Sequence, residues 1–307
     1  NARDKIQEAL ENYGVDIHFI TGGTLTNLTF LSHALRPYEA VISADTGHIN
    51  THETGAIEAS GHKVLSIPCT DGKLTADLIR PVLKQHENEH WVEPRLVYIS
   101  LPTELGTVYT KEELEKLYQF CKRHNLYLYI DGARLAMALA VEETQLTLKD
   151  LPDLCDAFYI GGTKNGAMFG EALILVNDDL KDHFRFNMKQ RGAILAKGWM
   201  IGVQFEELFQ DNLYLELGKR SVALAQRLKQ GFIDCKIPFL CDSPTNQLFP
   251  IFPNEFAQKI NENYVTTFQC KPDENHTCLR FCTSWATNEQ AVEDFIKDLK
   301  KWSYIYA

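Results

Sequence analysis

The stretch FYIGGTKNGAMFGEALILV, from Phe158 to Val176, joins two apolar runs through a glycine-rich turn that carries one lysine, Lys164. The two runs have the length and composition of buried strands. A lysine that serves solubility usually lies on a helix face or in a polar loop. A lysine held between glycines at the end of a buried strand is better placed to react than to be solvated. Lys164 is therefore the first candidate for a functional residue.

The chain on both sides of this stretch alternates between apolar runs and segments with helical spacing. From residue 16 to about 176, runs such as DIHFI, EAVIS, RLVYISL and LYLYID are each followed by a segment of helical pattern. Thr110 and Glu113 form a capping-box pattern at the start of one such segment. This alternation predicts an α/β fold, with a mostly parallel sheet and helices on both of its faces.

The pattern changes after residue 176, which indicates a second structural unit. Residues 179–231 have largely helical spacing, and short apolar runs then precede a final helical segment, NEQAVEDFIKDLKKW. A chain of 307 residues is expected to form about two domains. We expect a large domain over residues 1–210 and a smaller C-terminal α+β domain over residues 211–307.

The composition limits the partners that this protein can have. The chain has 31 basic and 41 acidic residues, a net charge of −10, and no basic run. Nucleic acids and anionic membranes need a local basic surplus, which this chain lacks. No apolar stretch approaches the roughly 18–20 residues that a transmembrane helix needs. Eight cysteines form no C-x-x-C pair and fit buried free thiols of a cytoplasmic protein better than zinc ligands. We expect a cytoplasmic protein with a small-molecule partner, and neither nucleic acid nor membrane.

In an open α/β sheet, functional groups gather at the carboxyl ends of the strands. DIHFI is followed by Thr21-Gly22-Gly23-Thr24 and then by a helical segment. Bare backbone N–H groups at Gly23, the helix dipole and the hydroxyl of Thr24 would favour an anion there. An ordinary glycine turn with a threonine cap is the alternative interpretation.

Two further strand ends carry charged or titratable groups. His48 and His52 follow EAVIS and would share a helix face, but a metal site needs a third ligand, and none lies nearby in the sequence. We therefore expect no metal, and a packing role for a histidine here is the alternative. Asp131 and Arg134 follow LYLYI. Asp131 is either the cap of the segment GARLAMALA or a partner of the amine that follows the next strand, Lys164.

A lysine, an acid, an arginine, an anion-binding turn and a histidine ring together fit one cofactor, pyridoxal 5'-phosphate. This cofactor needs a lysine for its aldehyde, a carboxylate for its pyridine nitrogen and donors for its phosphate. The glycines around Lys164 are expected to let a flat cofactor approach the backbone. A desolvated lysine also loses proton affinity and becomes nucleophilic.

At these residues the chain resembles the low-specificity threonine aldolases, within the aromatic amino acid beta-eliminating lyase/threonine aldolase family. The resemblance covers essentially the whole chain and rests on GGTLTN (22–27), HINTHETGA (48–56), TELGTVYT (103–110), YIDGARL (129–135), GGTKNG (161–166) and LRFCTSW (279–285). It implies the pyridoxal-phosphate-dependent aspartate aminotransferase fold, fold type I, with a seven-stranded sheet. It also implies a homodimer or homotetramer with active sites near the subunit interface.

The resemblance implies roles for the cofactor-binding residues. By position, Lys164 resembles the lysine that forms the Schiff base with the cofactor, and Asp131 resembles the partner of the pyridine nitrogen. His48 resembles the imidazole that stacks on the ring and is expected to be catalytic together with Lys164. Gly23 and Thr24 resemble the phosphate cradle.

The resemblance also assigns the substrate side of the site and shows two departures. Arg134 resembles the residue that serves the cofactor hydroxyl and the substrate carboxylate, and Arg280 resembles a second carboxylate clamp. Several family members have a second active-site histidine where this chain has Glu104, so the base of the reaction is left open. The first residues, NARDKIQEALENYG, predict an amphipathic helix, and the few dozen residues that relatives carry upstream are expected to be missing.

The activity that the resemblance implies is that of an aldehyde-lyase. Such an enzyme cleaves L-threonine or L-allo-threonine, which are β-hydroxy-α-amino acids, to glycine and an aldehyde by a retro-aldol reaction. One alternative keeps the cofactor and acts as a beta-eliminating lyase on another amino acid. Another is a catalytically silent binding protein, against which the intact set of Lys164, Asp131 and Arg134 argues.

Overall fold

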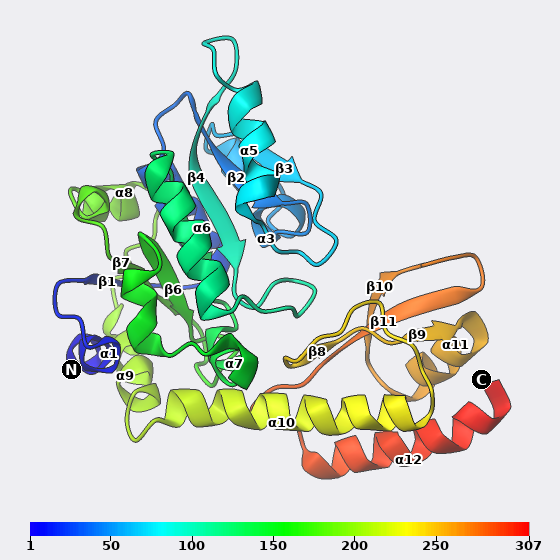
Figure 1. Cartoon of the computed structure of the whole chain (residues 1–307). Coiled ribbons are helices and arrows are strands. Elements are labelled where there is room, and N and C mark those ends of the chain that lie inside the picture. The colour runs from blue at the N-terminus through cyan, green and yellow to red at the C-terminus, as the bar shows by residue number, and fades with distance from the viewer. Residues whose placement is uncertain (307) are drawn as a thin grey trace.

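The structure is a computed structural model that describes residues 1–306, and it has two lobes that share one long helix (Figure 1). The larger lobe holds a seven-stranded sheet and the smaller lobe a four-stranded sheet. Helix α10 (Leu213–Asp234) extends from beneath the larger lobe to the smaller one, and α12 (Glu289–Tyr306) runs alongside it. Among the described residues, no helix is both long and apolar enough to cross a membrane.

The seven-stranded sheet confirms the expected α/β class, and its strand order is β1-β7-β6-β5-β4-β2-β3. The strands are β1 (Asp16–Ile20), β2 (Glu39–Ala44), β3 (Val64–Ile67), β4 (Glu93–Ser100), β5 (Tyr127–Asp131), β6 (Ala157–Gly161) and β7 (Glu171–Leu175). Strands β2 to β6 pair in parallel, whereas β7 is antiparallel to both β1 and β6. The carboxyl ends of β1 to β6 therefore lie at one edge of the sheet.

Helices cover both faces of this sheet, because side chains alternate between its faces along each strand. In β5, Leu128 and Ile130 belong to one apolar core and Tyr129 to the other. The Tyr129 core includes residues of α2 (Gly23–Ala34), α3 (His48–Thr51), α4 (Ala56–Ala59) and α8 (Phe184–Gln190). The opposite core includes residues of α1 (Ala2–Leu10), α5 (Ala76–Gln85), α6 (Lys111–Arg123), α7 (Leu135–Leu139) and α9 (Trp199–Leu208). Thr110 and Glu113 form the expected capping box at the start of α6.

The smaller lobe is an α+β unit around one apolar core. Its elements are β8 (Gln247–Leu248), β9 (Ile251–Pro253), β10 (Thr267–Cys270), β11 (His276–Cys282), α11 (Asn254–Asn263) and α12. Helix α10 serves both lobes, since Tyr214 packs in the core of the larger lobe and Phe232 in that of the smaller. The expected boundary between residues 210 and 211 falls just before α10, and this division into domains stays a prediction.

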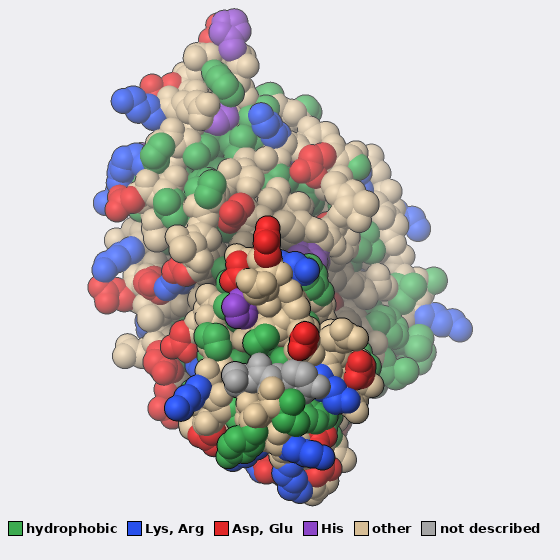
Figure 2. Space-filling view, turned by 90° about the vertical axis from the view of Figure 1, so that its right-hand side faces the viewer, with side chains coloured by type: hydrophobic (Ala, Val, Ile, Leu, Met, Phe, Trp, Pro, Cys, Tyr) green, Lys and Arg blue, Asp and Glu red, His purple; other side chains and the backbone are tan. Residues whose placement is uncertain are grey.

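The surface on the side of the smaller lobe carries charges of both signs. Figure 2 views the molecule with this lobe toward the reader, and there basic and acidic side chains lie among one another. On the face displayed, the basic side chains are not gathered into one patch.

Candidate active site

The edge at which β1 to β6 end brings the expected site residues together. Gly23 follows β1, His48 follows β2, Asp131 ends β5 and Lys164 follows β6. The charge of Asp131 favours the protonated forms of both His48 and Lys164, so these three groups lie within electrostatic reach of one another. The rule that functional groups gather at strand ends therefore locates one continuous site.

Asp131 is 3% exposed and accepts hydrogen bonds from three sides. Tyr98 donates to its Oδ2 at 2.6 Å, Asn27 Nδ2 donates to the same oxygen at 3.0 Å, and the backbone N–H of Ala133 donates to Oδ1 at 3.0 Å. Helix α7 begins only at Leu135, and no side chain caps it. The interpretation of Asp131 as the cap of this helix is therefore wrong.

His48 is held by a buried carboxylate. Its Nδ1 lies 2.8 Å from Oε1 of Glu53, which is 5% exposed and also accepts from Asn27 Nδ2 at 2.7 Å. Burial alone would lower the pKa of His48, but the hydrogen bond to Glu53 and the charge of Asp131 outweigh burial and raise this pKa. The imidazole is thus oriented by Glu53, as a ring that stacks on a cofactor needs to be.

Glu104 lies in the loop after β4 and touches the same group of residues. Its Oε1 accepts hydrogen bonds from Ser100 Oγ at 2.5 Å and from the backbone N–H of His48 at 3.0 Å. Burial, with a smaller contribution from the negative charge of Asp131, raises the pKa of Glu104 to about 7. A carboxyl group with this pKa can both take up and release a proton near neutral pH.

Lys164 lies half-buried in the turn between β6 and β7, and within residues 1–306 its amine makes no hydrogen bond or ion pair. Burial, and then the positive charge of Arg134, lowers the pKa of Lys164 below its usual value. Glu171 fixes the turn, because its carboxylate accepts from the N–H of Gly162 at 2.8 Å and from Thr163 Oγ1 at 2.7 Å. An unpaired amine of lowered pKa on a rigid turn is suited to attack an aldehyde.

The glycines before Lys164 serve the packing of the protein itself. A Cβ at Gly161 would lie 2.4 Å from the carbonyl oxygen of Ala133, and a Cβ at Gly162 would lie 2.6 Å from that of Gly170. The turn of Lys164 therefore packs directly on the turn that follows Asp131. The expectation that these two glycines make room for a cofactor is corrected, since backbone atoms of the protein already occupy that space.

Arg134 and Arg280 approach the site from different lobes. Arg134 Nη2 lies 3.9 Å from Sγ of Cys282 on β11, the strand that also carries Arg280. Arg280 Nε is buried without a hydrogen-bond partner among the described residues. Burial lowers the pKa of His52, and neighbouring cations lower it further. These cations are His48, Arg280, Lys164 and Arg134. Cations from both lobes thus gather where a carboxylate ligand would be stabilised.

The N-terminus of α2 has the form of an anion cradle. Its N-cap residue is Gly22, and no side chain accepts from the free N–H groups of the first turn. A Cβ at Gly22 would have no neighbour within 4 Å, and Thr24 is exposed beside it. The first turn of α2 therefore offers backbone donors, open space and a hydroxyl, which fits a phosphate group. The alternative role of a simple glycine turn remains for experiment to test.

His48 begins α3, and His52 follows the last residue of this helix. Their rings are stacked with centroids 5.4 Å apart, and His52 Nδ1 lies 2.6 Å from Thr51 Oγ1. Across residues 1–306, no three or more His, Cys, Asp or Glu side chains are grouped so that they could hold a metal ion.

The sequence did not single out Asn27, Tyr98 or Ser100 as site residues. All three are buried and hydrogen-bond to the carboxylates described above. Ser100 is paired in register with Asp131 on the adjacent strand, and Tyr98 lies two residues earlier on the same face of β4. That alternation is the signal that could have identified them, once β4 and β5 were known to be neighbours.

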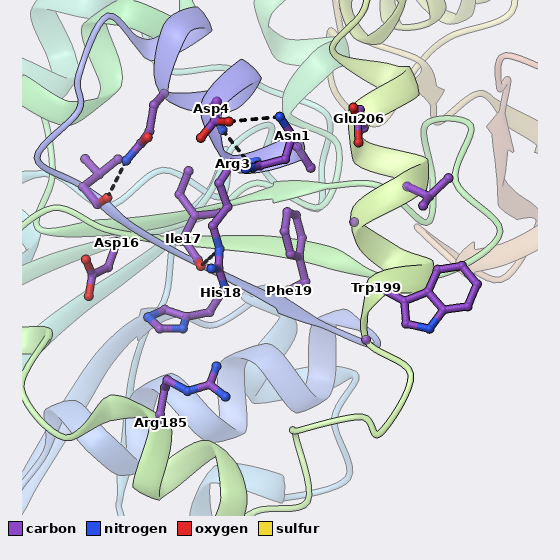
Figure 3. Close-up of a pocket in the computed structure, with 16 residues that line it drawn as sticks. Asn1, Arg3, Asp4, Asp16, Ile17, His18, Phe19, Arg185, Trp199 and Glu206 are labelled. Atoms are coloured by element: carbon purple, nitrogen blue, oxygen red, sulfur yellow. Dashed lines mark hydrogen bonds and ion pairs between the residues drawn. The ribbon is translucent and has the colours of Figure 1, made fainter.

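A large cavity lies outside this site. A cavity of about 1010 Å³ opens between α1, β1 and α9, and Figure 3 shows Arg3, His18 and Trp199 among its lining residues. None of the expected site residues lines it. Burial, with the charges of Arg3 and Arg185, lowers the pKa of His18 to about 4. This neutral ring packs against Phe184 at a centroid distance of 4.8 Å, which is a structural role.

Comparison with known proteins agrees with this geometry. Residues 2–252 match the beta-eliminating lyase family. A low specificity L-threonine aldolase of Pseudomonas sp. is 31% identical over 297 residues, which cover 93% of this chain and 82% of that protein. A solved structure of Leishmania major threonine aldolase is 51% identical, covers 98% of this chain and 88% of that one, and has a TM-score of 0.97.

The fold and the site together define an α/β enzyme in which a lysine, an aspartate and an arginine meet at one sheet edge. The chain belongs to the beta-eliminating lyase family, whose enzymes are lyases that depend on pyridoxal phosphate. The histidinol-phosphate aminotransferase of Clostridium acetobutylicum, 14% identical with a TM-score of 0.73, shares the fold. The expected family, lyase class and fold type I architecture are confirmed, and the role of each site residue stays a prediction.

Proposed function

We propose that this protein is a pyridoxal-phosphate-dependent aldehyde-lyase that cleaves L-threonine and L-allo-threonine to glycine and acetaldehyde. The observation that carries the proposal is the unpaired Lys164 amine, which lies at the same sheet edge as the fixed carboxylate of Asp131. The similarity to the Pseudomonas and Leishmania threonine aldolases supports threonine as the substrate.

The residues present fit pyridoxal phosphate. Lys164 would bind its aldehyde, Asp131 would face its pyridine nitrogen, and the first turn of α2 at Gly23 and Thr24 would hold its phosphate. His48, oriented by Glu53, would stack on its ring. When bound, this cofactor supplies an electron sink that stabilises negative charge on the substrate Cα.

The remaining residues bind and orient the substrate. Arg134 and Arg280 both carry planar guanidinium groups, which match the geometry of a carboxylate better than an ammonium group does. Because they come from different lobes, a substrate carboxylate held by both would fix which bond of Cα stands perpendicular to the cofactor ring. That orientation selects cleavage of the Cα–Cβ bond over other reactions of amino acids.

No relative and no site residue favours the two alternatives, a beta-eliminating lyase for another amino acid or a silent binding protein. A cytoplasmic location agrees with eight free cysteines and stays a prediction. We further propose a homodimer or homotetramer. Exposed apolar side chains near α9, namely Met168 at 88%, Trp199 at 67% and Val203 at 56% exposure, are suited to an interface between copies.

The test is a spectrum followed by product analysis. The purified protein with pyridoxal phosphate is expected to show a visible absorption band that borohydride abolishes, and to release glycine and acetaldehyde from L-threonine. L-Tyrosine and L-cysteine serve as comparison substrates for the beta-eliminating alternative. A protein that binds the cofactor but acts only on these two would contradict the proposal, and so would one that does not bind the cofactor.

A further inference from the structure

Seven residues at the site form one closed hydrogen-bonded circuit. The members, in order, are His48, Glu53, Asn27, Asp131, Tyr98, Ser100 and Glu104. The backbone N–H of His48 donates to Glu104 and closes the circuit. Three carboxyl groups are thus separated by Asn27 on one side and by two hydroxyl groups on the other. The protons of the hydroxyl groups in this circuit can therefore be assigned to particular hydrogen bonds.

This assignment shows that Glu104 can hold a proton without breaking the circuit. Tyr98 and Ser100 each own one hydroxyl proton, and their oxygens lie 3.2 Å apart. With Glu104 ionised, Ser100 donates to Glu104 and Tyr98 donates to Asp131, so no proton lies between the two hydroxyl oxygens. With Glu104 protonated at Oε2, Ser100 still donates to Oε1 of Glu104, and Tyr98 still donates to Asp131. No hydrogen bond of the circuit has to change between the two states.

One oxygen of Glu104 stays open to a ligand. Oε1 accepts both hydrogen bonds of this carboxyl group, one from Ser100 and one from His48. Oε2 makes no hydrogen bond to another described residue, and protein atoms do not fully enclose it. One side of the carboxyl group is therefore anchored, and the other can exchange a proton.

The neighbouring charges set the pH range of this exchange. Burial and the negative charge of Asp131 raise the pKa of Glu104 to about 7, whereas Ser100 and His48 act in the opposite direction. The other titratable groups at this point are less suited to act as a base. Glu53 orients the ring of His48 for the stacking role proposed above, and burial raises the pKa of Tyr98 well above its usual value. Burial and surrounding cations lower the pKa of His52.

We propose that Glu104 is the catalytic base that takes the proton from the substrate β-hydroxyl at Oε2, an inference that rests on the proposed threonine cleavage. The O–H electron pair becomes the second carbon–oxygen bond of the aldehyde, and the Cα–Cβ pair stays with Cα. Glu104 releases its proton to solvent and Cα takes up one. Threonine thus yields glycine and acetaldehyde with no atom gained or lost.

The decisive variant is Glu104→Gln, which keeps the shape of the side chain but cannot take a proton. Threonine cleavage is expected to fall by roughly 10²–10⁴-fold. The affinity for pyridoxal phosphate and the exchange of a glycine α-proton with solvent deuterium should stay within about three-fold, because glycine has no β-hydroxyl. In the wild type, kcat/KM for threonine should rise with pH through a midpoint near 7. In the Glu104→Gln variant this rise should be absent.

A second readout uses the protein without cofactor. Carbon-13 NMR of glutamate carboxyl groups should show two resonances that titrate near pH 7, one from Glu104 and one from Glu171. Glu104→Gln should remove one and Glu171→Gln the other.

Ser100→Ala should move the rise of kcat/KM for threonine to higher pH, because the hydroxyl of Ser100 lowers the pKa of Glu104. Glu58→Gln, the same change of charge on an exposed helix, is the control and should change none of these values.

The outcomes separate the two proposals. A wild type that does not cleave threonine overturns the proposed function. A wild type that cleaves threonine, with a Glu104→Gln variant of equal kcat and the same pH profile, overturns only the assignment of the base. A variant that loses cofactor affinity and glycine exchange together with cleavage also overturns that assignment, because Glu104 would then serve the integrity of the site.

Discussion

Tyr98 donates a 2.6 Å hydrogen bond to Oδ2 of Asp131 from the adjacent strand of the large sheet. Tyr98 is 1% exposed, so this hydroxyl bonds within the protein instead of with water. The carboxylate of Asp131 is thus held by a group on β4, by Asn27 on α2 and by the backbone of its own turn. The position of this acid therefore depends on the packing of the sheet and of α2 as well as on its local segment.

Tyr98→Phe should weaken binding of pyridoxal phosphate by roughly 10-fold and lower the free energy of unfolding by about 1–3 kcal/mol, the range for a lost bond to a charged group. Phenylalanine keeps the ring and removes only the hydroxyl. Cofactor titration and urea denaturation measure the two effects. Tyr118→Phe is the matched control, since its hydroxyl faces another carboxylate, Asp156, at 3.5 Å. An equal loss of cofactor affinity in both variants would contradict the role of Tyr98.

Asp131→Asn should leave the cofactor bound but lower turnover of threonine at least about 100-fold, which corresponds to about 2.7 kcal/mol of activation free energy. The amide oxygen can still accept from Tyr98 and Asn27, and only the hydrogen bond from the N–H of Ala133 is lost, so the fold is retained. The negative charge that would face the pyridine nitrogen is lost. Steady-state kinetics at saturating cofactor measure this effect. Unchanged turnover would mean that the carboxylate has only a structural role.

The strand-end residues of the site could be predicted from the sequence because each follows an apolar run. Lys164 and Asp131 are conspicuous as charged residues at the ends of buried strands, and the rule for open α/β sheets places them at one edge. Their surroundings could not be predicted in this way. Tyr98 and Ser100 look like ordinary strand residues until the register of β4 against β5 brings Ser100 opposite Asp131.

The role of the glycines was misjudged for a related reason. Gly161 and Gly162 stand next to the reactive lysine in the sequence, which suggested that they serve a cofactor. Their closest neighbours are instead backbone atoms of Ala133 and Gly170, contacts that depend on how two turns pack in three dimensions. A sequence pattern shows that a side chain is absent, but only the packing shows what takes its place.

Arg280→Lys should raise the Michaelis constant for threonine about 10-fold or more and leave the visible spectrum of the bound cofactor unchanged. Lysine keeps the charge but loses the planar fork that binds a carboxylate through two parallel hydrogen bonds. Arg220→Lys, on the exposed side of α10 where Arg220 pairs with Glu289 at 2.8 Å, is the control. If the Michaelis constant stays the same in the Arg280 variant, the smaller lobe has no part in substrate binding.

Glu171→Gln should change how stability depends on pH. Burial raises the pKa of Glu171 from 4.5 to about 7, so the folded state keeps a proton that the unfolded chain loses. The contribution of Glu171 to the free energy of unfolding therefore falls as pH rises from about 4.5 to about 7 and stays low above that. Glutamine cannot titrate, so stability of the variant relative to wild type should increase by on the order of 1–3 kcal/mol between about pH 5 and about pH 8.

Urea denaturation of the cofactor-free protein at a series of pH values measures this difference. Comparison with wild type at each pH cancels the contributions of the other titrating groups. Glu112→Gln, which removes a carboxylate 75% exposed on α6, should run parallel to wild type over the whole range. A Glu171→Gln variant that also runs parallel to wild type would show that Glu171 is ionised in the folded state at neutral pH.

The central claim is that Lys164 binds pyridoxal phosphate covalently, and the position of the modified lysine tests it most directly. Borohydride converts the bond between a lysine amine and the cofactor aldehyde into a stable amine, which proteolysis and mass spectrometry then locate. The account predicts modification at Lys164, and a Lys164→Ala variant that is folded, unmodified and inactive towards threonine. Modification of a different lysine, or threonine cleavage by the Lys164→Ala variant, would contradict the account.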